Sequence, residues 1–331
     1  MGAFHTSDIS GKSFLVTGGA GFIGSHIVAY LLVHGAGNVR VLDNLATGSL
    51  NNVALFKNDS RYEFMEGDIR DPTTCIKACA GIDHVSHQAA LGSVPRSVKD
   101  PVTSNDVNVS GFVNMITGAK DAGVKTFVYA SSSSVYGDEP NLPKKEDRTG
   151  NLLSPYAATK MTNELYASVF GRLYGMKVVG FRYFNVFGPR QDPNGPYAAV
   201  IPLFISGILN NTPVYINGDG EQTRDFTFVE NAVQANIKGM LTDNDAAYGQ
   251  VYNIAVGANF TVNFLFEAIS KLLYSDHRPV YRESRAGDIR DSLADISKAR
   301  QLLGYEPTRQ FLDGLKLTVE YFTDKIATQK L

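Results

Sequence analysis

The chain has 331 residues, of which 44% are hydrophobic and 19% charged, a composition typical of a globular protein with room for more than one domain. The formal net charge of −2, with acidic and basic residues interspersed, argues against the basic surface of a nucleic-acid-binding or membrane-surface protein. No apolar run approaches the roughly 20 residues of a membrane span, and "MGAFHTSD" lacks the features of a signal peptide, so we expect a soluble cytoplasmic protein.

The first half of the chain alternates β-prone runs with helical patterns of apolar residues. Strands are predicted over residues 12–18, 38–43, 61–69, 82–90, 125–131 and 176–185, and helices over about 21–35, 73–79, 101–122 and 155–173. Strands separated by helices predict an α/β protein with a Rossmann-type doubly wound parallel sheet and helices on both faces. Ligands of such sheets bind beyond the carboxyl ends of the strands.

This alternation loosens after about Gly188. Residues 192–204 are predicted to form a loop and then a helix, and residues 214–229 a hairpin-like excursion, before helices and short strands alternate to the end. No internal repeat or low-complexity linker separates these segments. We therefore expect a first domain over 1–188, with its core from about residue 12, and a smaller mixed α/β lobe over 189–331, some of whose segments return to the first domain.

Cys75 and Cys79 are the two cysteines, and they lie four residues apart on a predicted helix. That spacing on one helix disfavours a disulfide, and no further histidine or cysteine completes a metal-binding pattern. We expect two reduced packing cysteines and no metal site.

The segment "VTGGAGFIGSH" places Gly18, Gly21 and Gly24 between a predicted strand and a predicted helix. Glycines at this spacing allow a tight turn and let backbone N–H groups approach a pyrophosphate, which the positive end of the helix dipole also attracts. Asp43 ends the second strand, where a carboxylate can bind the ribose hydroxyls of NAD and repel the 2′-phosphate of NADP. Capping of a turn is the alternative role for Asp43, but the motif as a whole predicts an NAD site in the first domain.

The segment "SPYAATKMTNE" sets Tyr156 and Lys160 four residues apart, on one face of a predicted helix. A tyrosine near its reference pKa of ~10 is a poor base at neutral pH. A neighbouring ammonium, together with the cationic nicotinamide ring, would favour the phenolate and lower the pKa of Tyr156. By itself the pair fits a solvated helix face, but after a dinucleotide-binding pattern it predicts a catalytic tyrosine and lysine.

These two motifs, together with "ASSSSVYG" and "FRYFNVFGPR" in this order, resemble the extended short-chain dehydrogenase/reductases that modify nucleotide sugars, over nearly the whole chain. In that family a serine or threonine four residues before a Tyr-Gly pair works with the catalytic tyrosine. The resemblance therefore places Ser132 on the reacting hydroxyl of the sugar, beside Tyr156, with Ser133 next to it.

Around the cofactor, the resemblance implies residues from the glycine turn, the strand ends and the catalytic helix. They are Gly18, Gly21, Phe22, Ile23, Gly24, Asp43, Asn44, Asp68, Ile69, Ala89, Ala90, Asn108, Tyr156 and Lys160. Asp68 and Ile69 end the third predicted strand, where an adenine ring could lie, although a surface turn explains this pair equally well.

Nucleotide-sugar 4,6-dehydratases, which this chain also resembles, carry an Asp-Glu pair directly after the serine or threonine. Here Ser133 and Ser134 occupy these positions, and hydroxyls cannot perform that acid–base elimination of water. The pattern that remains resembles the UDP-hexose 4-epimerases. In those enzymes a tyrosine takes the 4-hydroxyl proton, and hydride passes to tightly bound NAD and then returns to the other face of the 4-keto sugar.

On the substrate side, the resemblance implies contacts to the sugar, the diphosphate and the uridine from several segments. They are Ser93, Ser132, Ser133, Tyr156, Asn185, Ala199, Arg224, Arg285, Asp288 and Ser292. Ser292 stands where epimerases restricted to glucose and galactose carry a large aromatic residue. The resemblance therefore favours 4-epimerisation of UDP-N-acetylglucosamine and UDP-N-acetylgalactosamine, with UDP-glucose and UDP-galactose as further candidates. A loop serine away from the sugar is the alternative for Ser292.

Two other interpretations remain open. A UDP-glucuronate 4-epimerase or decarboxylase of the same family needs a polar or basic group near C6 that the sequence does not locate. An NAD-binding regulator on the same fold would not need Tyr156, Lys160 and Ser132, which are all present.

The helices predicted over about 103–122 and 155–173 bear on oligomeric state. By resemblance, their exposed faces pair with the same helices of a second subunit in a four-helix bundle, which implies a homodimer. The sequence alone gives amphipathic helices that a monomer could equally bury against its own sheet.

Overall fold

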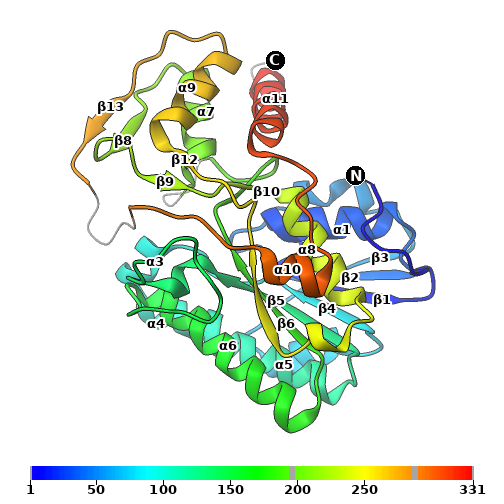
Figure 1. The fold of residues 1–331 in the computed structure, drawn as a ribbon. Coiled ribbons are helices and arrows are strands. Elements are labelled where there is room, and N and C mark those ends of the chain that lie inside the picture. Colours follow the sequence, from blue (N-terminus) through cyan, green and yellow to red (C-terminus); the bar gives the residue numbers. More distant parts are fainter. Residues whose placement is uncertain (1, 194–197, 285–289, 330–331) are drawn as a thin grey trace.

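The structure is a computed structural model that describes residues 2–193, 198–284 and 290–329 (Figure 1). At its centre, seven parallel strands form a sheet in the order β11-β6-β5-β4-β1-β2-β3. The strands are β1 (Ser13–Thr17), β2 (Asn38–Asp43), β3 (Tyr62–Glu66), β4 (His84–His87), β5 (Thr126–Ser132), β6 (Val178–Tyr183) and β11 (Gln250–Ile254). The predicted doubly wound sheet is confirmed, and its strand order reverses between β1 and β4, where such folds bind their ligands.

Helices cover both faces of this sheet (Figure 1). One face carries α1 (Phe22–Val33) and α8 (Val229–Leu241), and the other carries α2 (Pro72–Cys79), α5 (Gly111–Asp121) and α6 (Pro155–Tyr174). Neighbouring residues of a strand therefore enter different cores: Val16 of β1 joins the first core and Leu15 the second. Cys75 and Cys79 are buried in the second core with free thiols.

Local sequence signals determine the ends of α6, the helix that carries Tyr156 and Lys160. Ser154 is the N-cap, where its hydroxyl accepts a backbone hydrogen bond, and Pro155 follows in the first turn. The helix ends at Gly175 in the left-handed conformation, which glycine adopts without a steric cost. The two residues of the catalytic motif therefore lie in the first two turns of the helix.

The single helix predicted over about 101–122 has three parts. α4 (Pro101–Asn105) and α5 enclose a π-helical turn over Asp106–Ser110. Such turns are frequent at functional sites, and this one contains Asn108. Shorter helices around the sheet include α3 (Val94–Lys99), α10 (Ser297–Leu303) and a 3-10 helix over Ser133–Tyr136.

A second lobe contains α7 (Val200–Leu209), α9 (Val262–Leu272) and α11 (Phe311–Gln329) (Figure 1). Its three two-stranded sheets pair β8 (Tyr215–Asn217) with β13 (Val280–Arg282), β9 (Thr223–Arg224) with β12 (Phe260–Thr261), and β10 (Thr227–Phe228) with β7 (Val186–Phe187). The hairpin-like excursion predicted over 214–229 is wrong, because β8, β9 and β10 each pair with a strand from a distant segment rather than with one another. Local sequence patterns do not report such long-range pairing.

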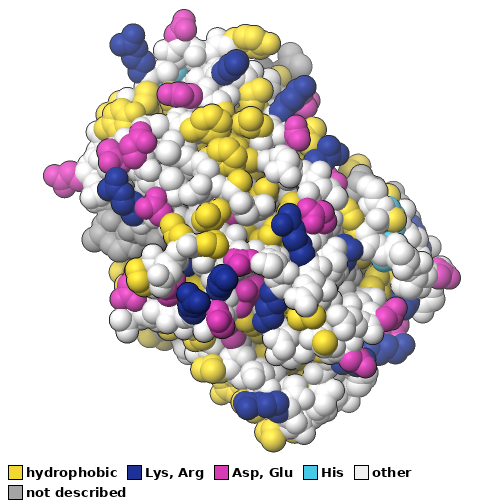
Figure 2. Space-filling view, viewed as in Figure 1, with side chains coloured by type: hydrophobic (Ala, Val, Ile, Leu, Met, Phe, Trp, Pro, Cys, Tyr) yellow, Lys and Arg dark blue, Asp and Glu magenta, His cyan; other side chains and the backbone are white. Residues whose placement is uncertain are grey.

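The two parts of the chain are interleaved. β11 comes from the second half of the sequence, yet it pairs with β6 along its whole length at the edge of the central sheet. Phenylalanines such as Phe187, Phe226 and Phe311 form a separate core in the second lobe. On the face shown in Figure 2, acidic and basic side chains are interspersed. Among the described helices, none combines the length and the hydropathy of a membrane span.

Candidate active site

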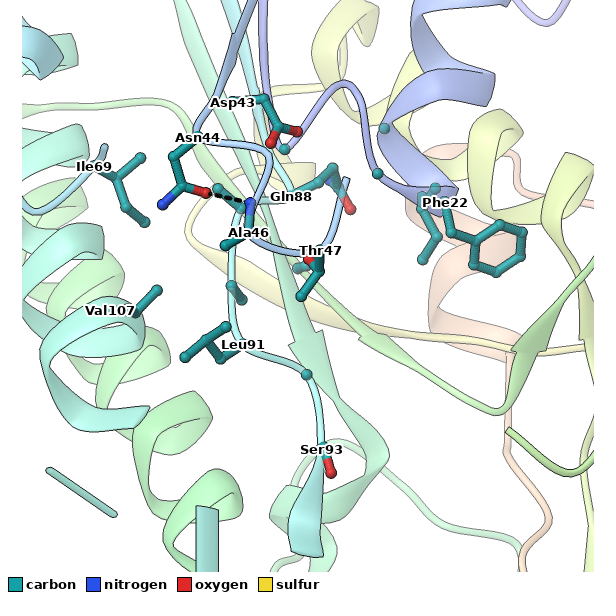
Figure 3. A pocket seen from close by; sticks show the side chains of 18 of the residues that line it. Phe22, Asp43, Asn44, Ala46, Thr47, Ile69, Gln88, Leu91, Ser93 and Val107 are labelled. Atoms are coloured by element: carbon teal, nitrogen blue, oxygen red, sulfur yellow. Dashed lines mark hydrogen bonds between the residues drawn. The ribbon is translucent and has the colours of Figure 1, made fainter. Parts of the chain in front are cut away.

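A cavity of about 590 Å³ opens where the carboxyl ends of β1 to β6 meet (Figure 3). It gathers residues that are far apart in the sequence, from the glycine turn to the first turns of α6. Of the residues predicted from the sequence, it is lined by Gly18, Gly21, Phe22, Ile23, Gly24, Asp43, Asn44, Asp68, Ile69, Ala89, Ala90, Ser93, Ser132, Tyr156, Lys160 and Asn185.

At its glycines, the turn between β1 and α1 leaves no space for a side chain. A Cβ on Gly24 would lie 2.2 Å from the carbonyl oxygen of Gly18. Gly18 itself has a φ of +66°, and a Cβ there would lie 2.8 Å from the backbone nitrogen of Ala89. No side chain among the described residues caps the N-terminus of α1, so its first N–H groups can bind an anion that the helix dipole attracts. This cradle fits the pyrophosphate of a dinucleotide.

Asp43 is buried at the end of β2 and holds the glycine turn in place. Its Oδ2 accepts a hydrogen bond from the N–H of Ala20 (2.9 Å), and its Oδ1 accepts one from the N–H of Leu45 (2.8 Å). The turn-capping role that the sequence left open is therefore present. Because each carboxylate oxygen has a further lone pair, Asp43 can also accept a ribose hydroxyl from its position in the cavity wall.

A polar rim lies beside the end of β3. The amide of Asn44 donates to Asp68 (2.9 Å), and Arg70 donates to both carboxylate oxygens of Asp68 (3.1 and 2.7 Å). These hydrogen bonds, chiefly those from Arg70, lower the pKa of Asp68 to about 2. Next to the rim, Ile69 and Val107 present apolar side chains to the cavity (Figure 3). The combination suits an adenine ring, which has a flat apolar face and a polar edge.

Tyr156 and Lys160 both line the cavity from α6. Lys160 is 3% exposed, its Nζ donates a hydrogen bond to the carbonyl oxygen of Ala130 (2.8 Å), and burial lowers its pKa to about 8. Burial raises the pKa of Tyr156, while the side chain of Ser132 acts in the opposite direction. The direction is the reverse of the one expected from Lys160, because the ammonium binds Ala130 and lies 5.9 Å from the tyrosine ring centre.

Neighbouring serines at the end of β5 lie in two different environments, a buried ion pair and the cavity wall. Oγ of Ser131 donates to Glu164 (2.5 Å), which also binds the guanidinium of Arg182 through both of its oxygens (2.9 and 2.7 Å). Glu164 and Arg182 are 8% and 3% exposed, so this buried ion pair fixes α6 against β5 and β6. The following residue, Ser132, lines the same cavity as Tyr156.

Other predicted residues do not line this cavity: Asn108, Ser133, Ala199, Arg224 and Ser292. Ser292 is half-buried in a segment whose neighbour Leu293 accepts a hydrogen bond from Lys144 (2.8 Å). Arg285 and Asp288 lie outside the described residues. The roles assigned to these seven residues, like the roles of the predicted residues that line the cavity, remain predictions.

Asn108 supports the cavity wall from the π-helical turn. Its side chain accepts a hydrogen bond from the N–H of Leu91 (2.8 Å) and donates to the carbonyl oxygen of Leu91 (3.2 Å) and to the hydroxyl of Thr159 (3.2 Å). Leu91 lines the cavity, and Thr159 precedes Lys160. Asn108 thus joins the loop after β4 to the catalytic helix.

Gln88 and Tyr183 line the cavity although the sequence analysis did not single them out. The hydroxyl of Tyr183 donates to Gln88 (3.2 Å) and accepts from Asn236 of α8 (2.7 Å), and Gln88 also donates to Asn236 (3.0 Å). Their positions directly after β4 and at the end of β6 were the available signal, because strand ends form the ligand site in this fold.

A second cavity of about 380 Å³ lies in the smaller lobe, next to Ala199. It is lined by Ala198, Val200, Leu203, Phe204, Ser206, Gly207, Thr212, Pro213, Val214, Tyr215, Asn217 and Arg282. The guanidinium of Arg282 lies 3.1 Å from the ring centre of Tyr215. The wall therefore offers flat aromatic and cationic groups together.

The glycine cradle, Asp43 and the cluster of Tyr156, Lys160 and Ser132 define a dinucleotide-dependent enzyme site on a Rossmann-type fold. Residues 14–255 match the NAD dependent epimerase/dehydratase family, and the chain belongs to this family. It is 38% identical over 313 residues to a UDP-glucose 4-epimerase from Mycolicibacterium smegmatis, covering 94% of this chain and 98% of that protein.

Two solved structures are similar over the same extent. One is a UDP-N-acetylglucosamine 4-epimerase from Methanobrevibacter ruminantium M1 in complex with UDP-N-acetylmuramic acid, with 43% identity, a TM-score of 0.90 and coverage of 95% of this chain and 99% of that chain. The other is a UDP-glucuronic acid 4-epimerase from Bacillus cereus in complex with UDP-glucuronic acid and NAD, with 32% identity, a TM-score of 0.88 and coverage of 95% and 99%. The family predicted from the motifs and NAD as its cofactor are confirmed.

Proposed function

We propose that the protein is an NAD-dependent UDP-sugar 4-epimerase that interconverts UDP-N-acetylglucosamine and UDP-N-acetylgalactosamine. The observation that carries the activity is the convergence of Tyr156, Lys160 and Ser132 on a cavity that also contains the glycine cradle. Ser133 and Ser134 supply no carboxylate for a dehydration. Tyr156 can act as a base, but no carboxylate pair is present to eliminate water. This combination supports oxidation and then reduction at one carbon of the sugar.

Tyr156, Ser132 and Lys160 then have separate roles in the reaction at C4 of the sugar. Bound NAD supplies a reversible hydride acceptor. Tyr156 takes the proton of the 4-hydroxyl and later returns it, and Ser132 donates a hydrogen bond at the same oxygen. Lys160, anchored on Ala130, provides a positive charge and a donor at the base of the site. The sugar must turn between the two half-reactions, so the protein has to hold the nucleotide firmly and the sugar loosely.

The nucleotide would be held by the smaller lobe. Asn185 lines the catalytic cavity, with a φ of +35°, and its amide donates to the carbonyl oxygen of Asp225 (3.2 Å). We propose that Asn185, Arg224 and Arg285 bind the diphosphate, and that Asp288 binds the uridine ribose. The second cavity, beside Ala199, has the flat cationic and aromatic wall that a uracil ring needs.

The N-acetyl preference is supported by the small side chains of Ser93 and Ser292. Ser93 lies at the N-terminus of α3 and lines the catalytic cavity. Ser292 lies in a segment pinned on both sides, since Thr223 donates to the carbonyl oxygen of Arg290 (2.9 Å) and Lys144 to that of Leu293. A residue on such a fixed segment can set the width of a pocket. The similarity to a UDP-N-acetylglucosamine 4-epimerase agrees with this preference.

The test is product analysis by NMR after incubating the purified protein with UDP-N-acetylglucosamine and no added NAD. We expect UDP-N-acetylgalactosamine to form, because the cofactor should remain bound through purification. A parallel sample with UDP-glucose measures the preference, and conversion of UDP-glucose at the higher rate would contradict it.

A UDP-glucuronate 4-epimerase is the second candidate, favoured by the similarity to the Bacillus cereus enzyme. This activity needs a basic or polar group at the C6 side of the sugar. If UDP-glucuronate is converted and both other sugars are not, the second candidate replaces the first.

We also propose that the protein forms a homodimer through α6 and α5. On α6, Leu165, Val169 and Leu173 recur every four residues and are 61%, 38% and 70% exposed, with exposed Tyr166 and Tyr174 beside them. Such a stripe fits the helix pairing implied by the resemblance. Sedimentation of the wild type and of Leu165→Glu/Leu173→Glu should give a dimer and a monomer; a monomeric wild type would refute the proposal.

A further inference from the structure

Ser97 of α3 is fully buried and holds the backbone of Tyr156. Its Oγ accepts a hydrogen bond from the N–H of Tyr156 (3.0 Å) and donates one to the carbonyl oxygen of Val94 (2.8 Å). Both directions are fixed by the partners, because a backbone N–H can only donate and a carbonyl oxygen can only accept. The hydroxyl of Ser97 therefore links α3 to the first turn of α6.

This link satisfies a group that α6 leaves unpaired. The first N–H groups of a helix have no acceptor within the helix. Pro155 has no N–H, and the N–H of Ala157 donates to Oγ of Ser154 (3.1 Å). Tyr156 lies between Pro155 and Ala157, so its N–H needs an acceptor from outside the helix, and Ser97 supplies it.

The carbonyl group of Tyr156 is held as well. The hydroxyl of Thr159 donates to this carbonyl oxygen (2.8 Å), and the amide of Asn108 donates to the hydroxyl of Thr159 (3.2 Å). Side chains from α3 and from the π-helical turn thus fix the backbone of Tyr156 on both sides. Because Tyr156 lines the cavity, its side chain starts from a backbone position that other elements determine.

The same short helix also contributes to the cavity wall. Ser93 is the N-cap residue of α3 and lines the cavity together with Tyr156. The N–H of Ser97 donates to the carbonyl oxygen of Ser93 (3.1 Å). One helical turn therefore connects Ser93, which we place beside the sugar, to the residue that holds Tyr156.

We propose that Ser97 is a positioning residue for the epimerase reaction, because it fixes Tyr156 relative to the part of the wall that Ser93 provides. This inference rests on the proposed function. Ser97 does not line the cavity, so it acts through Tyr156. A base works only within hydrogen-bond reach of the proton that it takes, and a displacement of about 1 Å can cost about 100-fold in rate.

Amide hydrogen exchange of the peptide over residues 154–160, measured by mass spectrometry, tests the hydrogen bond without substrate. In the wild type, the Tyr156 amide should be protected, although it lies in the first turn of a helix. Ser97→Ala should speed its exchange by about tenfold. Ser104→Ala is the matched control and should leave it unchanged, because the equally buried hydroxyl of Ser104 donates to Asp100 at the start of α4 (2.8 Å).

Kinetics then tests what the hydrogen bond does for the reaction. We expect Ser97→Ala to lower kcat by about tenfold and to leave KM for the UDP-sugar within about twofold, because the proposed substrate contacts remain. In the Tyr156→Phe background, Ser97→Ala should lower the residual rate no further, since the base that it positions is already absent. A residue that only stabilises the fold would lower the rate by the same factor in both backgrounds.

Three results would overturn the proposal: rapid exchange of the Tyr156 amide in the wild type, unchanged exchange in Ser97→Ala, or an equal fractional loss of kcat in both backgrounds. Melting temperature and NAD content of each variant show that the fold is retained. If the wild type converts no UDP-sugar, the proposed function fails, and the exchange result alone then decides whether Ser97 fixes Tyr156.

Discussion

The cofactor side and the nucleotide side of the site are built in different ways. The cofactor side stands on the carboxyl ends of six parallel strands, and its key groups come from short segments around Gly18, Asp43 and Tyr156. The proposed nucleotide side stands on two-stranded sheets of two or three residues per strand, each joined from distant parts of the chain. In the proposed function, the continuous sheet holds the reacting groups and the short strands hold the nucleotide.

This difference suits a reaction in which the sugar rotates to present its other face while the nucleotide stays bound. The groups that exchange the proton must keep their geometry through both half-reactions, and the buried pair of Glu164 and Arg182 anchors them. The nucleotide side has only to hold the far end of the substrate. Variants on the two sides should therefore fail in different ways.

The largest effect is expected from Gly24→Ala on the cofactor side. The new Cβ would lie 2.2 Å from the carbonyl oxygen of Gly18, so the turn must open and the pyrophosphate cradle is lost. We expect a purified protein without NAD and without activity, measured by the absorbance of cofactor released on denaturation. Gly11→Ala, which meets no atom within 4 Å, is the matched control and should retain NAD. Full NAD content in Gly24→Ala would show that the cradle lies elsewhere.

Tyr156→Phe should have the next largest effect. It should lower the rate of the chemical step without changing cofactor binding. It removes the proton acceptor while the ring and the helix remain, so we expect kcat to fall by about 10³-fold or more. NAD content and the melting temperature should stay near those of the wild type. Turnover at the wild-type rate would remove Tyr156 from the mechanism.

Asp225 joins separate segments of the chain beside the proposed nucleotide side, and its pKa makes this contact testable. Its carboxylate accepts hydrogen bonds from the backbone N–H groups of Val256 (3.0 Å), Gly257 (3.1 Å) and Ala294 (3.3 Å), and burial raises its pKa to about 6. Because the native pKa lies above the unfolded value, the native state binds more protons between the two values. The stability from this group is complete below about pH 4 and is lost as the pH rises through 6.

The measurement is the free energy of unfolding of the wild type minus that of Asp225→Asn, at intervals from pH 4 to pH 7. We expect the difference to fall by on the order of 2–3 kcal/mol across this range. Near neutral pH, Asp225→Asn should raise KM for the UDP-sugar and leave NAD content unchanged. A pH-independent difference would mean that Asp225 titrates at its ordinary pKa.

Ser292→Tyr should have the smallest effect and the most specific one. The larger ring fills the space that an N-acetyl group needs, so activity on UDP-N-acetylglucosamine should fall about tenfold more than activity on UDP-glucose. Ser292→Ala is the matched control and should leave the ratio unchanged. An equal loss on both sugars would show that Ser292 does not set the pocket width.

The same division explains how much the sequence could predict. Gly18 to Gly24, Asp43, and Tyr156 with Lys160 are local motifs, and the strand–helix alternation around them follows from residue periodicity, so the cofactor side was accessible. Gln88 and Tyr183 were missed because single polar residues at strand ends carry no spacing signal. The pairing of β8 with β13 was missed because it depends on contacts between segments 65 residues apart, which local patterns do not encode.

The pKa values of the site were the hardest property to predict from the sequence. The motif alone favoured a Tyr156 with a lowered pKa, but the pKa depends on burial and on where Lys160 points. The sequence singled out Ser134 only as a position without a carboxylate, and its two hydrogen bonds with Ser132 form because β5 ends in a 3-10 helix. Side-chain direction is a property of the folded chain.

The central claim is that the hydrogen at C4 leaves the sugar and returns to the same molecule within one site. The direct test is to incubate the protein with UDP-N-acetylglucosamine that carries deuterium at C4, in ordinary water, and to examine the epimer by NMR and mass spectrometry. The account predicts UDP-N-acetylgalactosamine that retains the deuterium at C4. An epimer whose deuterium has been replaced by solvent hydrogen would contradict it.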